Sequence, residues 1–566
     1  MVEICTSNEH CIKISNVNSG EEICHSVLLV EGIIESTNND CKAPMAVTIE
    51  QISGLLCNPP TTIHKVSSNM SFKCLLKLDL GMNKFIIKFC LVEKEIIFYF
   101  KPRQTNFCVV PIFVICKGHD GRFQAPAYED NSIESACERI STGIQIIQSL
   151  FAERLQRGGY GRLTFQLLAD IDQSAPDCHV FYSDISVKDA HNASADTLWT
   201  WLAREIMLSK LGSKERKYVA FLSSTHYNGS KVRKGVLTHE ETLQSTQGYV
   251  SLGGGGLALM GTGCLHTWAP SIEEVIPRLL NAVAVDKTQF MDESNYRGTY
   301  GGCYSTTLGA AAHEMGHTFD LGHNAHGLMG LDYHNIHDML VTEETSVSPV
   351  KSVAENYSQQ MQLDKNLSLG KGDEEYQKLL NISTGKERCE ELVPELQVVW
   401  SLPKSQISCK TTCMLKSDNT NTMSKFEKHR NTAKHCSGMS TEHHQYETSG
   451  EKDFFRPTFD RDDASPFWPE SCISILSFHK WFNPDATTDY SGDFHFDPSQ
   501  KQISSEYGLG VIEIRDSESQ SILHWKFPRE SLPKTFNIPE HYIYPNSHIL
   551  WVIDQVGNSK AFDLKK

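Results

Sequence analysis

The stretch His313-Glu314-Met315-Gly316-His317-Thr318-Phe319-Asp320-Leu321-Gly322-His323 decides the interpretation of this chain. The small residues before it, from Thr306 to Ala312, include no proline, so a helix can run into the stretch without interruption. On that helix His313 and His317 lie four residues apart and share one face. A catalytic zinc needs three protein ligands and an open position for water, and His323 supplies the third ligand if the chain turns back after the helix.

Glu314 directly follows the first histidine, so it can reach a water on the metal without being a ligand itself. That is the position of a general base in hydrolysis by a zinc-bound water, with the zinc polarising the carbonyl that is attacked. The apolar residues on either side, such as Leu308 and Phe319, predict a buried helix. Burying three imidazoles and a carboxylate without a metal would be costly. The motif therefore predicts zinc as the cofactor, these three histidines as its ligands and Glu314 as the catalytic residue.

The spacing resembles the metzincin signature H-E-x-x-H-x-x-G-x-x-H of zinc metalloproteases, in which a methionine turn lies beneath the metal. Met329, in Gly327-Leu328-Met329-Gly330, resembles that methionine. Residues 253–259 (Gly-Gly-Gly-Gly-Leu-Ala-Leu) and 475–482 (Ile-Leu-Ser-Phe-His-Lys-Trp-Phe), together with the active-site helix, resemble a eukaryotic zinc metalloprotease family known from fungi and animals. The resemblance spans residues 105–340 and resumes near residue 465.

The chain departs from the metzincin pattern at the eighth position, where glycine normally ends the helix in a left-handed conformation and this sequence has Asp320. Aspartate and asparagine are the other residues that best tolerate this conformation, so we expect the turn to be kept. Three more histidines, His326, His334 and His337, follow closely. The offset favours His323 as the third ligand, with His326 as the alternative.

The resemblance implies a zinc metallopeptidase that acts on protein or peptide substrates as an endopeptidase. Tyr333, four residues after Met329, is a candidate donor to the oxyanion, as tyrosines beyond the methionine turn are in some metzincins, although the offset differs. Two alternatives stay open, a non-catalytic binding protein stabilised by zinc and a hydrolase of a non-protein amide. Glu314 argues against the first, because a structural zinc site has no use for that carboxylate. The motif does not distinguish a hydrolase of a non-protein amide from a peptidase.

Composition limits the partners and the location. The net charge of -16 argues against nucleic acid or anionic membranes as main partners. No apolar stretch approaches the roughly 20 residues of a membrane span. The 18 cysteines are scattered, many of them in apolar runs, and residues 1–7 do not resemble a secretory signal, so we expect a cytoplasmic chain with reduced thiols. Six Asn-x-Ser sites would matter only if the chain were secreted by an unrecognised route. The sequence does not specify the oligomeric state.

The order of predicted elements indicates an α+β fold, with a metzincin-like mixed sheet and active-site helix flanked by β-sandwich-like modules. Short β-rich runs at 27–30, 46–49, 75–78, 85–89 and 96–100 predict the first sandwich. Strands at 109–115, 163–167 and 218–222 alternate with helices at 132–155 and 197–211. We expect a β-sandwich-like module at 1–103, a catalytic domain at 104–344, a partly disordered polar insertion or linker at 345–460, a returning helix of the catalytic domain at 461–485 and a β-rich segment at 486–566.

Two further motifs are candidate ligand sites. A glycine run such as Gly253 to Gly256 is compatible with a phosphate-binding loop, but no Gly-Lys-Ser/Thr follows it. The run instead favours a close approach of two backbone segments. In a protease of this type, we expect the neighbouring edge strand to hold an extended peptide. In the insertion, the spacing of six Cys and His residues fits no common structural zinc site, which argues against a second zinc. They are Cys409, Cys413, His435, Cys436, His443 and His444. The β-rich carboxyl-terminal residues either form a module of their own or complete the first sandwich.

Overall fold

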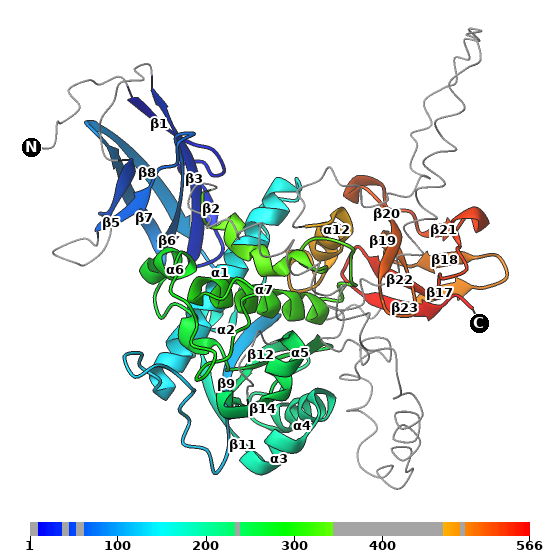
Figure 1. The fold of residues 1–566 in the computed structure, drawn as a ribbon. Coiled ribbons are helices and arrows are strands. Elements are labelled where there is room, and N and C mark those ends of the chain that lie inside the picture. Colours follow the sequence, from blue (N-terminus) through cyan, green and yellow to red (C-terminus); the bar gives the residue numbers. More distant parts are fainter. Residues whose placement is uncertain are drawn as a thin grey trace, which may run out of the picture.

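The computed structural model describes residues 10–36, 45–52, 61–231, 238–342, 468–486 and 493–565. These residues form several β-sheets with helices on both faces of the central one, so the predicted α+β class is confirmed (Figure 1). The expected insertion at 345–460, with its cysteines and histidines, lies outside the described residues.

The amino-terminal strands form two sheets that share one hydrophobic core. Alternating burial along the strands, as in β7 (Gly81–Phe89), places Phe85 and Ile87 in this core together with Phe72 and Phe98. The predicted strands of the sandwich are confirmed. One sheet has the order β1 (His10–Ile14), β3 (Val27–Ser36), β6 (Ser71–Lys77), and the other the order β2 (Glu22–Ile23), β8 (Val92–Phe100), β7 (Gly81–Phe89), β4 (Ala46–Gln51), β5 (Thr61–Lys65).

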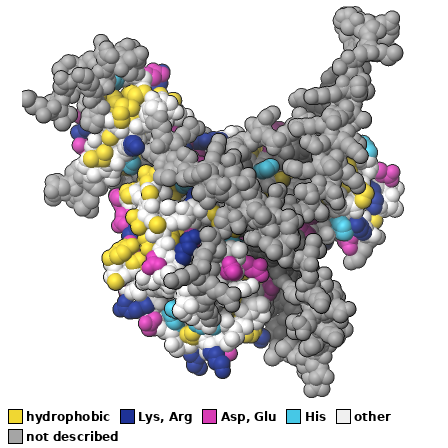
Figure 2. Space-filling model, in the orientation of Figure 1, with side chains coloured by type: hydrophobic (Ala, Val, Ile, Leu, Met, Phe, Trp, Pro, Cys, Tyr) yellow, Lys and Arg dark blue, Asp and Glu magenta, His cyan; other side chains and the backbone are white. Residues whose placement is uncertain are grey.

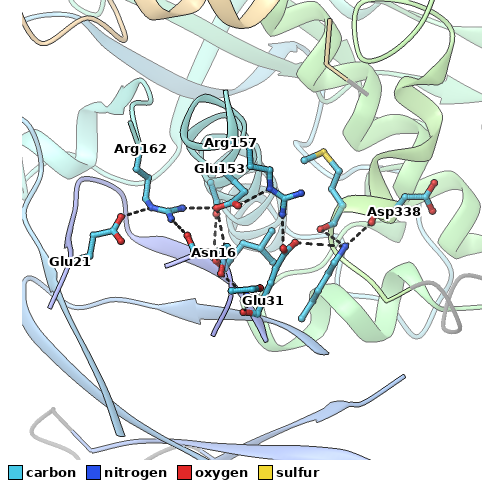
Figure 3. Close-up of polar contacts among 12 residues, drawn as sticks. Asn16, Glu21, Glu31, Glu153, Arg157, Arg162 and Asp338 are labelled. Atoms are coloured by element: carbon cyan, nitrogen blue, oxygen red, sulfur yellow. Dashed lines mark hydrogen bonds and ion pairs between the residues drawn. The ribbon is translucent and has the colours of Figure 1, made fainter. Parts of the chain in front are cut away.

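A network of charged side chains joins this sandwich to helix α1 (Ile133–Arg157) (Figure 3). Glu153 of α1 is buried at 1% exposure and accepts hydrogen bonds from Arg162 (2.6 Å) and Arg157 (2.9 Å). Arg162 also pairs with Glu21 (2.9 Å) and Arg157 with Glu31 (2.6 Å), both from the sandwich. Because most of these groups are shielded from water, losing one partner would leave a poorly compensated charge.

The central sheet is parallel except at one edge. Its order is β10 (Gln166–Leu167), β9 (Cys108–Lys117), β12 (Arg216–Leu222), β16 (Leu257–Gly261) and β15 (Ser251–Gly254), and β11 (His179–Ser186) also pairs with β9. β15 runs antiparallel to β16 and forms the edge. The strand predicted at 163–167 is shorter than expected, because β11 takes the place beside β9 from Ile112 onward.

Helices cover both faces of this sheet, and each face has its own hydrophobic cluster (Figure 1). Along β9, Val109 and Phe113 face one cluster while Val110 and Ile112 face the other. The first cluster contains α1, α7 (Tyr300–Thr318) and α12 (Glu470–Phe478); the second contains α3 (Val187–Asn192) and α4 (Ala195–Leu208).

The carboxyl-terminal strands also form two sheets around a common core, which contains Ile512, Trp525 and Val552. Within the described part of the chain, none of these strands joins a sheet of the first sandwich, so they form a module of their own and do not complete it. The sheets have the orders β17 (Phe494–Asp497), β18 (Gln502–Ser505), β21 (Thr535–Asn537) and β20 (Ser521–Lys526), β19 (Leu509–Arg515), β22 (Ile549–Asp554), β23 (Ser559–Asp563).

The surface carries charges of both signs. On the face drawn in Figure 2, both basic and acidic side chains of the described residues reach the surface. Among the described residues, no helix combines the length and the apolar character needed to cross a membrane.

Candidate metal centre

Helix α7 carries the first two histidines of the motif. The helix begins after Thr299, whose side chain accepts a hydrogen bond from the backbone N–H of Gly302, and it ends at Thr318. His313 and His317 lie one turn apart and are buried, at 8% and 2% exposure. Their Nε2 atoms are 3.1 Å apart. The helix thus brings two imidazoles together at the spacing that the motif predicts.

The chain reverses at the end of α7 through a left-handed residue, Asp320, with φ 64°. The N–H of Asp320 donates to the carbonyl of His317 (3.2 Å), and the N–H of Leu321 donates to the carbonyl of Gly316 (3.1 Å). This is the Schellman arrangement, in which glycine usually holds the left-handed position. The prediction that aspartate keeps the turn is confirmed, and the turn directs the following residues back toward the helix.

This reversal places the imidazole of His323 beside the other two. Its ring centroid lies 5.5 Å from that of His313 and 4.6 Å from that of His317. One ligand nitrogen from each of the three imidazoles can be chosen so that all lie within 4.8 Å of one another. The structure therefore brings together the three histidines that the sequence analysis selected.

Each imidazole places Nδ1 near a backbone carbonyl oxygen, which can only accept a hydrogen bond. The three pairs are His313 with Leu328 (2.7 Å), His317 with Leu321 (3.0 Å) and His323 with Glu518 (3.5 Å). Nδ1 therefore carries the proton, and the lone pair of Nε2 is left for another partner. Metal-binding histidines are commonly oriented in this way, through a carbonyl on the second ring nitrogen.

The donor set fits a zinc ion. With both Nε2 atoms unprotonated, the lone pairs of His313 and His317 face each other at 3.1 Å, which is repulsive unless a cation lies between them. In a tetrahedral site with Zn–N bonds of about 2.0–2.1 Å, ligand nitrogens are about 3.3–3.4 Å apart. Burial lowers the pKa of His313 and of His323 to about 4, so both imidazoles are neutral and able to coordinate at neutral pH.

The carboxylate of Glu314 faces the edge strand β15. Ser251 Oγ donates a hydrogen bond to Oε1 of Glu314 (3.1 Å), and the backbone N–H of Gly253 donates to the same carboxylate. Burial raises the pKa of Glu314 to about 7, and these two donors oppose the shift. A carboxyl group with a pKa near neutrality is suited to accept a proton and return it at pH 7.

Contact between α7 and β15 depends on the glycine run. A Cβ at Gly253 would lie 2.0 Å from the backbone oxygen of Glu314, so only glycine fits. Gly255, with φ 53°, turns the chain from β15 into β16. The close backbone approach predicted for this run is confirmed. The run is a hairpin between two strands of the central sheet, so the phosphate-loop alternative is wrong.

Met329 and Tyr333 lie beside the three-histidine cluster. Met329 is fully buried, and its sulfur packs so closely against Gly316 that a Cβ there would lie 2.4 Å away. The ring of Tyr333 lies 5.4 Å from the ring of His313 between centroids. The methionine that resembles the methionine turn is thus packed against the helical turn between the first two histidines.

The later histidines lie apart from this cluster. The side chain of His326 is 71% exposed, and its Nδ1 lies 3.7 Å from the carboxylate of Asp332. His337 bonds through Nδ1 to Ser305 (2.8 Å), and the same hydroxyl donates to the backbone oxygen of His334 (2.8 Å). The geometry therefore favours His323 over His326 as the third member of the group.

Sequence analysis missed the partners that hold these side chains. Ser251 is 63 residues from Glu314, and Glu518 is 195 residues from His323. The glycine run beside Ser251 was the one available signal, because it predicted a close approach at that strand. The partner of His323 is a backbone carbonyl, which every residue type supplies, so no residue pattern marks it.

Comparison with known families matches residues 11–367 to a family described as "Putative peptidase family". The match covers more than half of the 566 residues. The chain belongs to this family. The matched range includes α7 and all three histidines, and it ends before α12 and the carboxyl-terminal sheets. Membership of the "Putative peptidase family" is consistent with the resemblance to a metalloprotease family in the sequence analysis.

Two fungal proteins are similar to this member of the "Putative peptidase family". A "Putative zinc metalloproteinase" of Saccharomyces cerevisiae is 24% identical over 369 residues, which is 59% of this chain and 49% of that protein. Another "Putative zinc metalloproteinase", of Schizosaccharomyces pombe, is 21% identical over 354 residues, which is 59% of this chain and 54% of that protein. The chain spans about half the length of these curated relatives.

Proposed function

We propose that the chain is a zinc-dependent metallopeptidase of the metzincin type that acts as an endopeptidase on proteins or peptides. The observation that carries this proposal is the convergence of His313, His317 and His323, two of them on the helix that also carries the buried carboxylate of Glu314. The family description names a peptidase, and both fungal relatives are named zinc metalloproteinases. Zinc held by the three histidines would supply an activated water and polarise the scissile carbonyl.

Glu314 acts as the general base in this proposal. Its carboxylate accepts the proton of the attacking water and passes it to the leaving amine. Ser251 and the N–H of Gly253 hold the carboxylate in one orientation. Tyr333, whose ring lies beside that of His313, donates to the carbonyl oxygen as it gains charge.

The edge strand β15 binds the substrate in this proposal. An extended peptide can add to an open strand edge through main-chain hydrogen bonds, and this does not require a chain terminus. Because Ser251 and Gly253 are part of β15, a peptide added to its edge runs past Glu314. Recognition of main chain at an open edge favours cleavage within a chain, as an endopeptidase does.

We also propose that the domain limits follow the sequence analysis: a sandwich module at 1–103, a catalytic domain at 104–344 that includes the returning helix at 461–485, and a carboxyl-terminal segment at 486–566. The separate hydrophobic cores of the two outer modules support these limits. The packing of α12 in the same core as α1 and α7 supports its assignment to the catalytic domain.

The test compares the zinc-loaded full-length chain with Glu314→Gln on a whole-proteome peptide library, with new termini read by mass spectrometry. Glutamine is nearly isosteric and Glu314 is not a proposed ligand, so the variant should keep its zinc. Its hydrolysis should fall by about 100- to 10,000-fold, the usual contribution of a positioned acid–base group. His323→Ala should lower the zinc content, whereas His326→Ala, changed at an exposed histidine, should not.

Three results would contradict the proposal. Undiminished hydrolysis by Glu314→Gln would exclude that residue as the base. A zinc-loaded wild type that cleaves no peptide would support a binding protein, or, if it cleaves small amides, a hydrolase of another class. Loss of zinc from His326→Ala with full zinc in His323→Ala would show that the third ligand is His326.

A further inference from the structure

The loop that carries the third histidine is bound by the carboxyl-terminal module. The N–H of His323 donates to the backbone oxygen of Ser519 (3.0 Å), and the N–H of Ser521 donates to the backbone oxygen of His323 (2.7 Å). These bonds form a parallel bridge between His323 and Gln520. Ser519 and Gln520 lie in the turn between β19 and β20, so this hairpin adds a strand-like contact to the loop.

Arg515 extends the contact to the turn after α7. Its Nη2 donates to the backbone oxygen of Asp320 (2.8 Å), and its Nε donates to the carboxylate of Glu513 (2.5 Å). Glu513 also accepts a hydrogen bond from the hydroxyl of Ser521 (2.7 Å). The side chains of Arg515 and Glu513 are only 5% and 2% exposed. A buried charge pair of this kind holds a fixed geometry, because any movement would expose one charge to an apolar environment.

The loop packs closely against the hairpin. A Cβ at Gly322 would lie 2.7 Å from the backbone oxygen of Ser519 and 2.9 Å from Nε of Arg515. On the other side, Ser559 of β23 donates to the carboxylate of Asp320 (2.8 Å). Asp320, at the position where the metzincin pattern has glycine, therefore provides a side-chain contact to the carboxyl-terminal module that glycine could not make.

The three histidines thus differ in what orients them. The carbonyls near Nδ1 of His313 and His317 belong to Leu328 and Leu321, inside the family match at 11–367. The carbonyl near Nδ1 of His323 belongs to Glu518, outside that match. Partners that orient a metal-binding histidine commonly change metal affinity by about 10- to 100-fold when they are lost.

We propose that the β19–β20 hairpin is a positioning element of the metal centre: Arg515 and the turn 516–520 hold His323 in the orientation that completes the three-histidine set. The proposal rests on the metal site proposed above. It makes the carboxyl-terminal module part of the catalytic apparatus. The alternative is that the hairpin only packs the module onto the rest of the chain.

The first test compares Arg515→Met with Arg529→Met in the full-length chain. Arg529 also joins the carboxyl-terminal module to the rest of the protein, through the backbone oxygen of Ser477 (2.5 Å) and the ring of Phe478 (4.7 Å), but it contacts α12 and not the histidine loop. We expect Arg515→Met to weaken zinc binding, measured by competition with a chelator, by about 10- to 100-fold. Arg529→Met should bind zinc as the wild type does.

The second test uses Asp516, which shapes the turn of the hairpin from within. Its Oδ1 accepts hydrogen bonds from the backbone N–H groups of Glu518 (2.8 Å) and Gln520 (2.9 Å). Asp516→Ala removes both bonds and should weaken zinc binding, whereas Asp516→Asn keeps an acceptor oxygen and should restore it. If Arg515→Met does not fold, Asp516→Ala and Asp516→Asn still test whether the hairpin holds His323 in place.

Absorption of cobalt bound in place of zinc reports the ligand geometry independently of hydrolysis. Its visible bands should change in Arg515→Met and Asp516→Ala and match the wild type in Arg529→Met. Wild-type zinc affinity and an unchanged cobalt spectrum in both hairpin variants would overturn the inference, as would an equal loss in Arg529→Met. A wild type that binds no zinc would instead refute the proposed function.

Discussion

Replacing Gly253 by alanine should separate the carboxylate of Glu314, the proposed general base, from its support without removing any of the three proposed metal ligands. Gly253 lies in the edge strand β15 against α7, and its N–H donates to the carboxylate of Glu314. A Cβ at this position would lie 2.0 Å from the backbone oxygen of Glu314, 2.6 Å from its carbonyl carbon and 2.7 Å from its Cα. All three atoms belong to a helix backbone, so no side-chain rotation relieves the overlap.

The required displacement can be worked out from these distances. Ordinary contact begins at 3.4 Å, so strand and helix must separate by about 1.4 Å (3.4 minus 2.0). A displacement of about 1 Å in a catalytic group costs roughly 100-fold in rate. Overpacking of this kind also destabilises a fold by about 1–3 kcal/mol. We therefore expect Gly253→Ala to keep its zinc, to lose about 100-fold in peptide hydrolysis and to unfold at a lower urea concentration.

The matched control is Gly255→Ala, two residues along the same run. The nearest atoms to a Cβ there belong to Trp199, at 3.9 and 4.0 Å, so no clash arises, and only the left-handed φ of 53° is strained. This strain costs about 1–2 kcal/mol. Gly255→Ala should therefore lose stability but hydrolyse peptides like the wild type. Hydrolysis by Gly253→Ala at the wild-type rate, or an equal loss in both variants, would refute the reasoning.

Two other predictions concern stability. Glu153→Ala should lower the free energy of unfolding by about 3–5 kcal/mol in urea titrations, because Arg162 is left poorly compensated in a buried site. Glu35→Ala, which breaks the exposed pair with Lys13, should have a much smaller effect, and equal effects of the two substitutions would contradict the importance of burial. Burial raises the pKa of Glu293 from 4.5 to about 7, because the folded state disfavours the charged carboxylate. The free energy of unfolding therefore has its full value below pH 4.5, and it falls as the pH rises through 7 and the buried carboxyl group ionises. The free energy of unfolding of Glu293→Gln should therefore be higher than that of the wild type at pH 8 and similar to it at pH 5. A stability difference between the two proteins that does not change with pH would contradict this role of Glu293.

The elements that depend on local patterns could be predicted from the sequence. The spacing of His313 and His317 places them on one helix face, and the tolerance of aspartate for a left-handed φ accounts for the turn at Asp320. Short β-rich runs separated by turns also predicted the strands of the first sandwich. Each of these depends on residues within one turn or one strand.

What could not be predicted depends on contacts between distant segments. The strand expected at 163–167 is reduced to Gln166–Leu167, because β11 competes for the same edge of β9. The glycine run beside Ser251 predicts a close backbone approach at that strand, but it does not mark Ser251 as the partner of Glu314. The hairpin contact with His323 is made through backbone atoms, and their positions follow from the packing of the whole carboxyl-terminal module.

The long separation along the chain between His323 and its hairpin has a consequence during synthesis. Glu518 leaves the ribosome 195 residues after His323. At about 5–20 residues per second, roughly 10–40 s pass between the two events. For that time the nascent polypeptide has all three histidines of the cluster but lacks the hairpin that, in the proposal above, holds His323 in place. In the order of synthesis, the proposed metal site therefore gains its last supporting contact only once the β19–β20 hairpin has been made and has folded against the loop of His323.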